Sequence, residues 1–239
     1  MMQCKSGLVW VFMLLAFCVK AQNVVQESTP ITIGESLRID SKIMAESRQI
    51  NIYLPAELNK EEAKKYDEII LTLIPNYRQM VEVLVSILPF TQDQSFSVID
   101  LGCGTGTISR EIKNTFPNID LTCVDIAKNM LDIASAKNGP DTTLIQADFN
   151  TFVFPQKYDA IVSSLALHHL ETDEDKQGFY AKIFGALNDG GIFVNIDVVT
   201  SDDSILQQIY LQKWKNFMVN NTSIDEVENK WLPNYYAED

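Results

Sequence analysis

The stretch that decides the fold is Val98-Ile-Asp-Leu-Gly-Cys-Gly-Thr-Gly106, a short apolar run followed by glycines at every second position. Glycines between a predicted strand and a predicted helix let the backbone approach a ligand closely and leave the first N–H groups of the helix facing it. A dinucleotide site of the G-x-G-x-x-G type would place its third glycine at position 107, which is Thr107 here. The spacing therefore indicates a ligand-binding loop of another kind.

Acidic residues accompany this loop. Asp100 lies in the strand before it, and a carboxylate there repels a pyrophosphate but attracts an ammonium group, so the loop suits a ligand with a cationic end. Asp125 ends a second strand, at the position from which a carboxylate accepts both ribose hydroxyls. Asp148 follows the third strand and is either an adenine ligand or a helix N-cap or turn residue. Met130 and Phe149 are predicted to pack on the adenine faces.

Outward from the loop, strands and helices alternate. Strands are predicted at 97–101, 120–125, 143–146, 158–163 and 191–198, and helices at 107–116, 128–137 and 175–187. Asp189-Gly-Gly191 is predicted to be the turn before the fifth strand. Strands that alternate with helices at this spacing predict an α/β fold with a doubly wound, mostly parallel sheet covered on both faces.

The flanking segments have other patterns. Residues 57–88 carry apolar residues at helical spacing and predict a long helix that Pro75 kinks or divides, and residues 203–231 are predicted to be helical. Residues 31–55 alternate apolar and polar side chains and predict an N-terminal β-hairpin. This hairpin resembles the strands that open secreted esterase-D-like α/β hydrolases, but the chain has no G-x-S-x-G motif, so hydrolase chemistry is not expected.

The first 21 residues have the pattern of a secretory signal peptide. Lys5 precedes an apolar run at 8–19, and Val19-Lys-Ala21 offers small residues at the cleavage positions. The run is shorter than the ~20 residues that span a bilayer, so no stable membrane span is expected. The alternative is a buried apolar helix at the start of a cytosolic protein. Cys103 and Cys123 lie beyond this segment without metal-ligand spacing and are predicted to be small buried residues.

Composition narrows the range of partners. The 239 residues include 46% hydrophobic side chains, which is ordinary for a globular protein, but the formal net charge is −13. A chain this acidic lacks the electrostatic footprint of a nucleic-acid binder, so a small-molecule partner is expected. The oligomeric state cannot be predicted from the sequence.

Together these motifs resemble the class I S-adenosylmethionine-dependent methyltransferases. The resemblance rests on VIDLGCGTG, CVD at 123–125, QADF at 146–149, YDAIVSSLALHHL at 158–170 and LNDGGIFVNID at 187–197, and it covers about residues 61–239. It implies a Rossmann-like methyltransferase fold with S-adenosyl-L-methionine as cofactor. The implied ligands are Asp100, Gly102, Gly104 and Gly106 for the methionine part, Asp125 for the ribose, Asp148 for the adenine, and Ser164 and Leu165 beside the methyl group.

The implied reaction is an in-line attack of an acceptor atom on the sulfonium methyl, for which the protein mainly supplies positioning. His168 and His169 follow the fourth strand. We interpret them first as residues that cap or pack the loop, and alternatively as a general base or a substrate-orienting group. The helices around the sheet also resemble the branch that makes carboxy-S-adenosylmethionine, although that branch usually departs from GCGTG.

Methyltransferases of this class normally add two strands after the fifth, and the resemblance implies that this chain lacks them. The expected division is signal peptide 1–21, hairpin segment and linker 22–60, and an incomplete methyltransferase domain 61–239, as in a composite or truncated chain. A catalytically defective cofactor-binding remnant is therefore the alternative function, with a nicotinamide oxidoreductase third. Localisation is in conflict, because the leader predicts export while the cofactor is intracellular. The fifth strand is expected to be an exposed edge, which the hairpin could cover.

Overall fold

A computed structural model describes residues 34–41, 46–53 and 60–232, with side chains from residue 65 onward except that of residue 230. Residues 1–21, where we predict a signal peptide, lie outside the described residues, and the predicted domain boundaries at 21 and 60 stay predictions. Among the helices in the described ranges, none combines the length and the apolar character needed to cross a bilayer.

The larger of the two described sheets has five strands. They are β3 (Ser97–Leu101), β4 (Asp120–Asp125), β5 (Thr143–Gln146), β6 (Tyr158–Ser164) and β7 (Leu187–Ile196). Their order is β5-β4-β3-β6-β7, and every neighbouring pair is parallel. The predicted doubly wound parallel sheet is thereby confirmed. The chain order reverses between β3 and β6, and in such sheets ligands bind beyond the carboxyl ends of the strands at that point.

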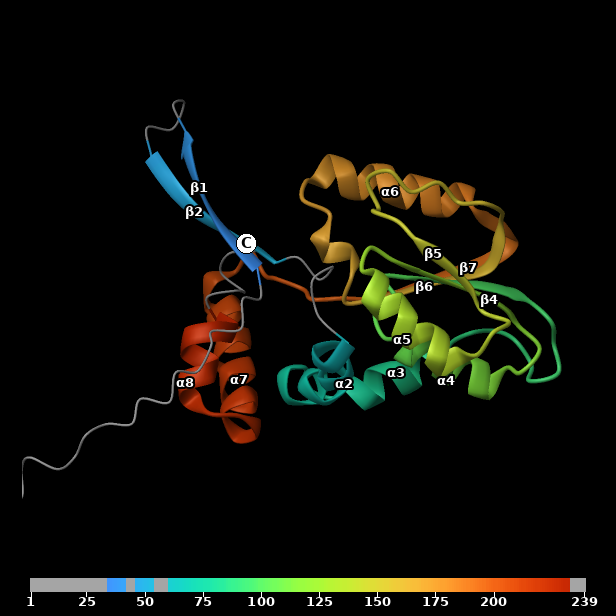
Figure 1. The fold of residues 1–239 in the computed structure, drawn as a ribbon, viewed down its shortest axis with the longest axis horizontal. Coiled ribbons are helices and arrows are strands. Elements are labelled where there is room, and N and C mark those ends of the chain that lie inside the picture. Colours follow the sequence, from blue (N-terminus) through green and yellow to red (C-terminus); the bar gives the residue numbers. More distant parts are fainter. Residues whose placement is uncertain (1–33, 42–45, 54–59, 233–239) are drawn as a thin grey trace, which may run out of the picture. The chain divides into compact units, whose positions relative to one another are not determined.

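Helices cover both faces of this sheet. On one face lie α3 (Tyr77–Ser86), α4 (Thr107–Thr115) and α5 (Lys128–Asn138), and on the other lies α6 (Asp173–Gly185) (Figure 1). Because successive strand residues point to opposite faces, Val98 packs in the cluster beneath α3–α5 while Ile99 packs in the cluster beneath α6. Both side chains are fully buried.

The predicted helix at 57–88 is divided into two, as its proline suggests. α2 (Lys60–Leu73) ends before Pro75, and α3 begins after Asn76, which adopts a left-handed conformation with φ 59°. The C-terminal region is helical as predicted, with α7 (Ser204–Asn221), α8 (Ile224–Glu226) and a π-helical turn, η3 (Val227–Trp231). The Nε1 of Trp214 in α7 donates a hydrogen bond of 2.8 Å to the carbonyl oxygen of Leu73.

The start of the fifth strand differs from the prediction. β7 begins at Leu187, so the predicted turn at 189–191 lies inside the strand. Leu187 pairs with Tyr158 and Ile192 pairs with Ala160, and the extra residues between them form an irregularity in the ladder. Gly190, with φ 80°, allows this, because a bulge often needs a residue at positive φ. β7 is an edge strand of the described sheet, as expected.

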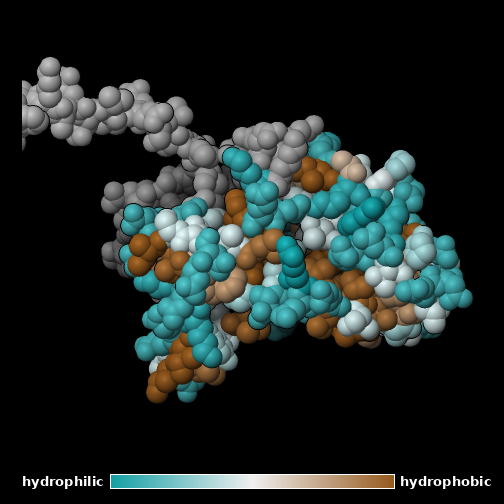
Figure 2. Space-filling view, turned by 90° about the horizontal axis from the view of Figure 1, so that it is seen from below, coloured by the Kyte–Doolittle hydropathy of each residue, from teal (hydrophilic) through white to brown (hydrophobic). Residues whose placement is uncertain are grey.

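The predicted N-terminal hairpin is present as β1 (Gly34–Ser41) and β2 (Glu46–Tyr53). The strands are antiparallel, with Gly34 opposite Tyr53, and they form a two-stranded sheet of their own. On the face shown in Figure 2, hydrophilic residues predominate and hydrophobic ones form separate patches, as expected for an acidic chain of average apolar content.

Candidate cofactor-binding and active site

The glycine loop joins β3 to α4 and has a backbone that other residues adopt only with strain. Gly102, Gly104 and Gly106 have φ values of 71°, 52° and 75°. A Cβ on Gly102 would lie 2.3 Å from the Cβ of Ala166, and one on Gly106 would lie 2.5 Å from Nδ2 of Asn138, whereas a Cβ on Gly104 would meet no atom within 4 Å. Close packing therefore requires glycine at positions 102 and 106. At Gly104 the space beside the backbone is open, so a ligand could approach it.

Asp125, at the carboxyl end of β4, is tied to this loop. Its Oδ2 accepts a hydrogen bond of 2.8 Å from the backbone N–H of Gly104, and its Oδ1 accepts one of 2.8 Å from the N–H of Ala127. Overall the pKa of Asp125 is raised, because the effect of desolvation exceeds the opposite effect of these backbone hydrogen bonds. A carboxylate has about four lone-pair directions, so both oxygens can still accept ribose hydroxyls. The predicted ribose ligand is therefore placed beside the glycine loop.

Asp100 is a buried acid without a cationic partner among the described residues. Its side chain is 1% exposed, and the hydroxyl of Ser109 donates a hydrogen bond of 2.6 Å to its Oδ2. Burial, together with a smaller effect of the nearby Asp125, raises the pKa of Asp100 to about 6, although the hydrogen bond from Ser109 acts in the opposite direction. A buried acid whose pKa is raised by desolvation and by a neighbouring carboxylate favours a cation beside it. This environment fits the ammonium and sulfonium groups of S-adenosylmethionine.

The loop after β6 also lies at the carboxyl edge of the sheet, beside the glycine loop. Ser164 ends the strand opposite Ile196, and the N–H of Leu165 donates a hydrogen bond of 2.8 Å to the carbonyl oxygen of Ile196. Leu165 has φ 52°, which is unusual for a bulky side chain and is typical of functional sites. The next residue, Ala166, packs against Gly102. The two predicted methyl-side residues therefore lie next to the glycine loop.

Asp148, the acid after the third strand, has the geometry of a turn residue, which is one of the two roles predicted for it. Asp148 is exposed, and its Oδ1 accepts hydrogen bonds of 2.9 and 3.0 Å from the backbone N–H and the Nδ2 of Asn150. The neighbouring Phe149 comes within 3.5 Å of the position that a Cβ on Gly102 would occupy. The ring therefore borders the glycine loop, and the adenine role of Asp148 stays a prediction.

Met130 and Phe149 have separate packing partners. Its side chain is 4% exposed and packs with Ala127 and Tyr66, whereas Phe149 packs in the α6-side cluster against Phe179, with ring centroids 4.9 Å apart. The two residues predicted to pack on the adenine faces thus belong to different clusters, and their adenine roles stay predictions.

The two histidines lie in a 3₁₀ turn, η2 (Leu167–His169), and differ in their contacts. Nδ1 of His168 lies 2.6 Å from Oδ1 of Asp197, and the backbone N–H of His168 donates a hydrogen bond of 3.1 Å to Oδ2 of the same carboxylate. His169 lies beside His168 with ring centroids 4.1 Å apart. Desolvation, followed by the nearby His168, lowers the pKa of His169 to about 4. Asp197 is the last residue of the motif at 187–197, but no role for it could be predicted from the sequence.

Helix α2 also contributes side chains that the sequence analysis did not identify. Asp67 accepts hydrogen bonds from the hydroxyls of Thr105 and Thr107 in and after the glycine loop, and its Oδ2 pairs with Nζ of Lys137 at 2.7 Å. Burial raises the pKa of Tyr66, and Asp125 adds to the shift, which places this tyrosine near the predicted ribose ligand. These contacts join residues that are far apart in the sequence, and no spacing pattern in the sequence predicts them.

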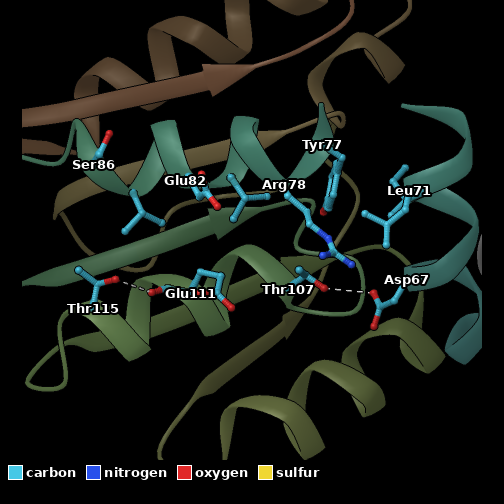
Figure 3. Close-up of a pocket in the computed structure, with 12 residues that line it drawn as sticks. Asp67, Leu71, Tyr77, Arg78, Glu82, Ser86, Thr107, Glu111 and Thr115 are labelled. Atoms are coloured by element: carbon cyan, nitrogen blue, oxygen red, sulfur yellow. Dashed lines mark hydrogen bonds between the residues drawn. The ribbon is translucent and has the colours of Figure 1, made fainter. Parts of the chain in front are cut away.

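A groove of about 600 Å³ lies between α2, α3 and α4 (Figure 3). Its walls include the apolar side chains of Ile70, Val81 and Val85, and Arg78 extends from α3 toward Thr107 and Asp67. None of the predicted site residues lines this groove. The candidate site is therefore the crevice at the carboxyl ends of β3, β4 and β6, and the groove adjoins it through the loop–helix contacts.

Comparison with known proteins agrees with this geometry. A family model described as a methyltransferase domain matches residues 98–191. The carboxy-S-adenosyl-L-methionine synthase of Campylobacter lari is 25% identical over 164 residues, which are 67% of this chain and 69% of that protein. Malonyl-[acyl-carrier protein] O-methyltransferase 2 of Ilyobacter polytropus is 30% identical over 134 residues, which are 55% of this chain and 49% of that protein.

Among solved structures, the crystal structure of Streptomyces venezuelae DesVI is similar with a TM-score of 0.50 and 25% identity, over 62% of this chain and 61% of that chain. The chain thus spans about half to two thirds of the proteins that it matches. The matched segment begins in β3 and ends in β7, and so it contains the glycine loop and all three strand ends of the crevice. Residues 98–191 therefore match a methyltransferase domain, which agrees with the resemblance found in the sequence and with S-adenosylmethionine as the cofactor.

Proposed function

We propose that this chain transfers the methyl group of S-adenosylmethionine to a small-molecule acceptor. The observation that carries the proposal is the hydrogen bond between Asp125 and the N–H of Gly104 at the reversal point of the sheet. It holds a carboxylate with spare acceptor capacity against an open glycine loop, which is the arrangement that a nucleoside with free ribose hydroxyls requires.

The remaining residues of the crevice have complementary roles in this proposal. Asp100 would face the cationic end of the cofactor, and the turn at Leu165 would border its methyl group. The cofactor supplies an activated methyl group, so the protein's contribution is to position the acceptor and to exclude water. Neither role needs a metal ion.

A small acceptor fits the charge of the chain. The net charge of −13 opposes the approach of a nucleic acid, while a neutral or cationic small molecule meets no such barrier. We propose that the reaction takes place where S-adenosylmethionine is made, inside the cell.

There are two alternatives to methyl transfer. A defective remnant would bind the cofactor without transferring its methyl group. The similarity to the Campylobacter lari synthase favours a second reaction, in which S-adenosylmethionine is itself carboxylated. Mass spectrometry of the cofactor after incubation with candidate methyl acceptors, and separately with candidate carboxyl donors, distinguishes them. Methyl transfer leaves S-adenosylhomocysteine, a synthase supplied with a carboxyl donor leaves a heavier cofactor, and a remnant leaves the cofactor unchanged.

The direct test is calorimetric titration with S-adenosylhomocysteine. We expect micromolar binding that Asp125→Ala weakens about 10- to 100-fold, because the variant loses hydrogen bonds to a charged group. Asp120→Ala is the matched control, since Asp120 is an exposed residue at the opposite end of the same strand and should bind normally. Circular dichroism verifies that both variants fold. Absence of binding at millimolar ligand would contradict the proposal, and binding of NADH instead would favour an oxidoreductase.

A further inference from the structure

The turn that carries His168 is fixed to the cofactor loop. Ala166, two residues earlier, lies so close to Gly102 that no Cβ fits between them. The 3₁₀ turn follows directly, and the side chain of His168 is 26% exposed. The turn therefore lies at the carboxyl edge of the sheet, beside the glycine loop, and the imidazole of His168 retains access to solvent.

Asp197 fixes the orientation of this imidazole. One carboxylate oxygen accepts the backbone N–H of His168 at 3.1 Å, and the other lies 2.6 Å from Nδ1. Burial raises the pKa of Asp197, but the hydrogen bond and charge of His168 outweigh it and lower the pKa overall. An ionised carboxylate can only accept hydrogen bonds, so Nδ1 carries the proton. In the neutral ring, the lone pair is therefore on Nε2.

A purely structural role explains only part of this arrangement. To end the turn, Asp197 needs to accept the backbone N–H alone, and one oxygen does so. The second oxygen accepts the backbone N–H of Val198 at 2.9 Å, and its further contact with Nδ1 selects the tautomer of the ring, which neither backbone hydrogen bond requires. Carboxylate–imidazole pairs of this kind hold a histidine ready to take a proton at its other nitrogen.

His169 provides a contrast within the same turn. Its ring has no carboxylate hydrogen-bond partner among the described residues, and its pKa is lowered to about 4. It therefore accepts a proton only weakly at neutral pH. The titratable groups that interact with His168 are Asp197 from the end of β7 and His169 from its own turn.

We propose that His168, oriented by Asp197, is the general base that takes a proton from the methyl acceptor. The acceptor is then a small molecule whose nucleophilic atom carries a hydrogen, an amine or a hydroxyl, and not a carboxylate, which needs no base. A hydroxyl, or an amine in its ammonium form, gives its O–H or N–H proton to Nε2 of His168. The electron pair freed on the acceptor atom forms the bond to the methyl carbon, and the pair of the broken carbon–sulfur bond stays on sulfur. This inference rests on the proposed methyl transfer.

A first test needs no acceptor. Diethylpyrocarbonate acylates unprotonated imidazole nitrogens, and the chain contains only two histidines, so a tag-free protein reports each one by mass spectrometry. We expect saturating S-adenosylhomocysteine to slow acylation of His168 at least tenfold, in wild type and in His169→Gln. Equal rates with and without bound ligand would overturn the inference. If S-adenosylhomocysteine does not bind at all, the proposed function fails first, so the two failures are distinguishable.

A second test uses S-adenosylmethionine with a labelled methyl group and a panel of small amines, phenols and carboxylic acids. We expect transfer to an amine or a phenol, and the member of the panel that is labelled identifies which. His168→Gln should lower kcat about 100-fold or more with KM for S-adenosylmethionine unchanged. Asp197→Asn should act similarly, because the amide donates to Nδ1 and moves the ring proton to Nε2, and it should also lower acylation of Nε2. His169→Gln is the matched control with normal kcat. Labelling of carboxylic acids alone, or unchanged kcat in His168→Gln, would contradict the assignment.

Discussion

At the scale of single residues, the site contains acids whose hydrogen bonds only partly offset the cost of removing their carboxylates from water. Asp100 is almost fully buried, with a serine hydroxyl as its hydrogen-bond donor and a second carboxylate nearby. In the absence of ligand the folded chain therefore holds a proton on Asp100 more tightly than the unfolded chain does. Such a residue favours binding of a cation at the expense of stability.

The pH dependence of stability tests this interpretation. The pKa of Asp100 is about 6 in the folded chain, against 3.8 for an ordinary aspartate. Its contribution to stability is complete below pH 4 and is lost as the pH rises through 6, because the folded state binds the proton in that range and the unfolded state does not. Asp100→Asn removes this loss. Between pH 5 and 8 we expect its free energy of unfolding to gain about 1.5 kcal/mol relative to wild type, measured by urea denaturation.

The exposed Asp120→Asn is the control and should follow the wild-type pH profile. Parallel profiles for Asp100→Asn and wild type would show that Asp100 titrates normally. The same variant should bind S-adenosylhomocysteine more weakly, because its ammonium group then meets an amide in place of a carboxylate.

At the scale of elements, α2 is attached to the site by a small polar cluster. Asp67 on α2, Lys137 on α5 and the hydroxyls of Thr105 and Thr107 form connected hydrogen bonds. The cluster joins three elements, whereas the pair Lys128–Asp132 lies within α5 alone. Hydrogen bonds and ion pairs between elements stabilise the packing of those elements against each other, whereas an ion pair within one helix stabilises only that helix.

A double-mutant cycle separates the two kinds of pair. For Asp67→Asn and Lys137→Ala we expect a coupling energy of about 1 kcal/mol, discounted because both groups keep partial solvent access. For Lys128→Ala and Asp132→Asn we expect no more than about 0.5 kcal/mol. Hydrogen exchange should become faster in α2 only in the first set. Equal coupling energies in both sets would show that the cluster does not fasten the helix.

The helices and strands were largely predictable from the sequence, whereas the side-chain contacts between them were not. The strands at 97–101, 120–125 and 143–146 agree with the structure residue for residue, because short apolar runs between glycines and helices leave little freedom. The glycine loop and Asp125 could be found from spacing alone. The contacts of Asp197 and of the α2 residues could not, because they join segments far apart in the chain, even though Asp197 itself ends the motif at 187–197. The bulge in β7 was missed because glycines in sequence indicate a turn more often than an irregular strand.

At the scale of the whole molecule, cofactor binding should stabilise the fold as one unit, because residues of the crevice come from β3, β4, β6 and the loop after β6. At 100 times its dissociation constant, S-adenosylhomocysteine should add about 2.7 kcal/mol to the free energy of unfolding. Thermal or urea denaturation with increasing ligand measures this. Asp125→Ala should show a much smaller shift at the same concentration, and NADH should produce none in either protein. A shift that is equal for wild type and variant would place the ligand elsewhere.

The order β5-β4-β3-β6-β7 has a consequence for the kinetics of folding. β3, β4 and β5 pair with near neighbours in the sequence, but β6 returns to β3 across 62 residues, as in the hydrogen bond from Ser163 to the carbonyl oxygen of Leu101. Long-range pairing is the slow step in folding, because the entropy of the enclosed loop is lost before contacts compensate it. The contact of Ala166 with Gly102 forms only after that step. We expect the crevice to be completed late, so that bound ligand slows unfolding and leaves the rate of folding unchanged.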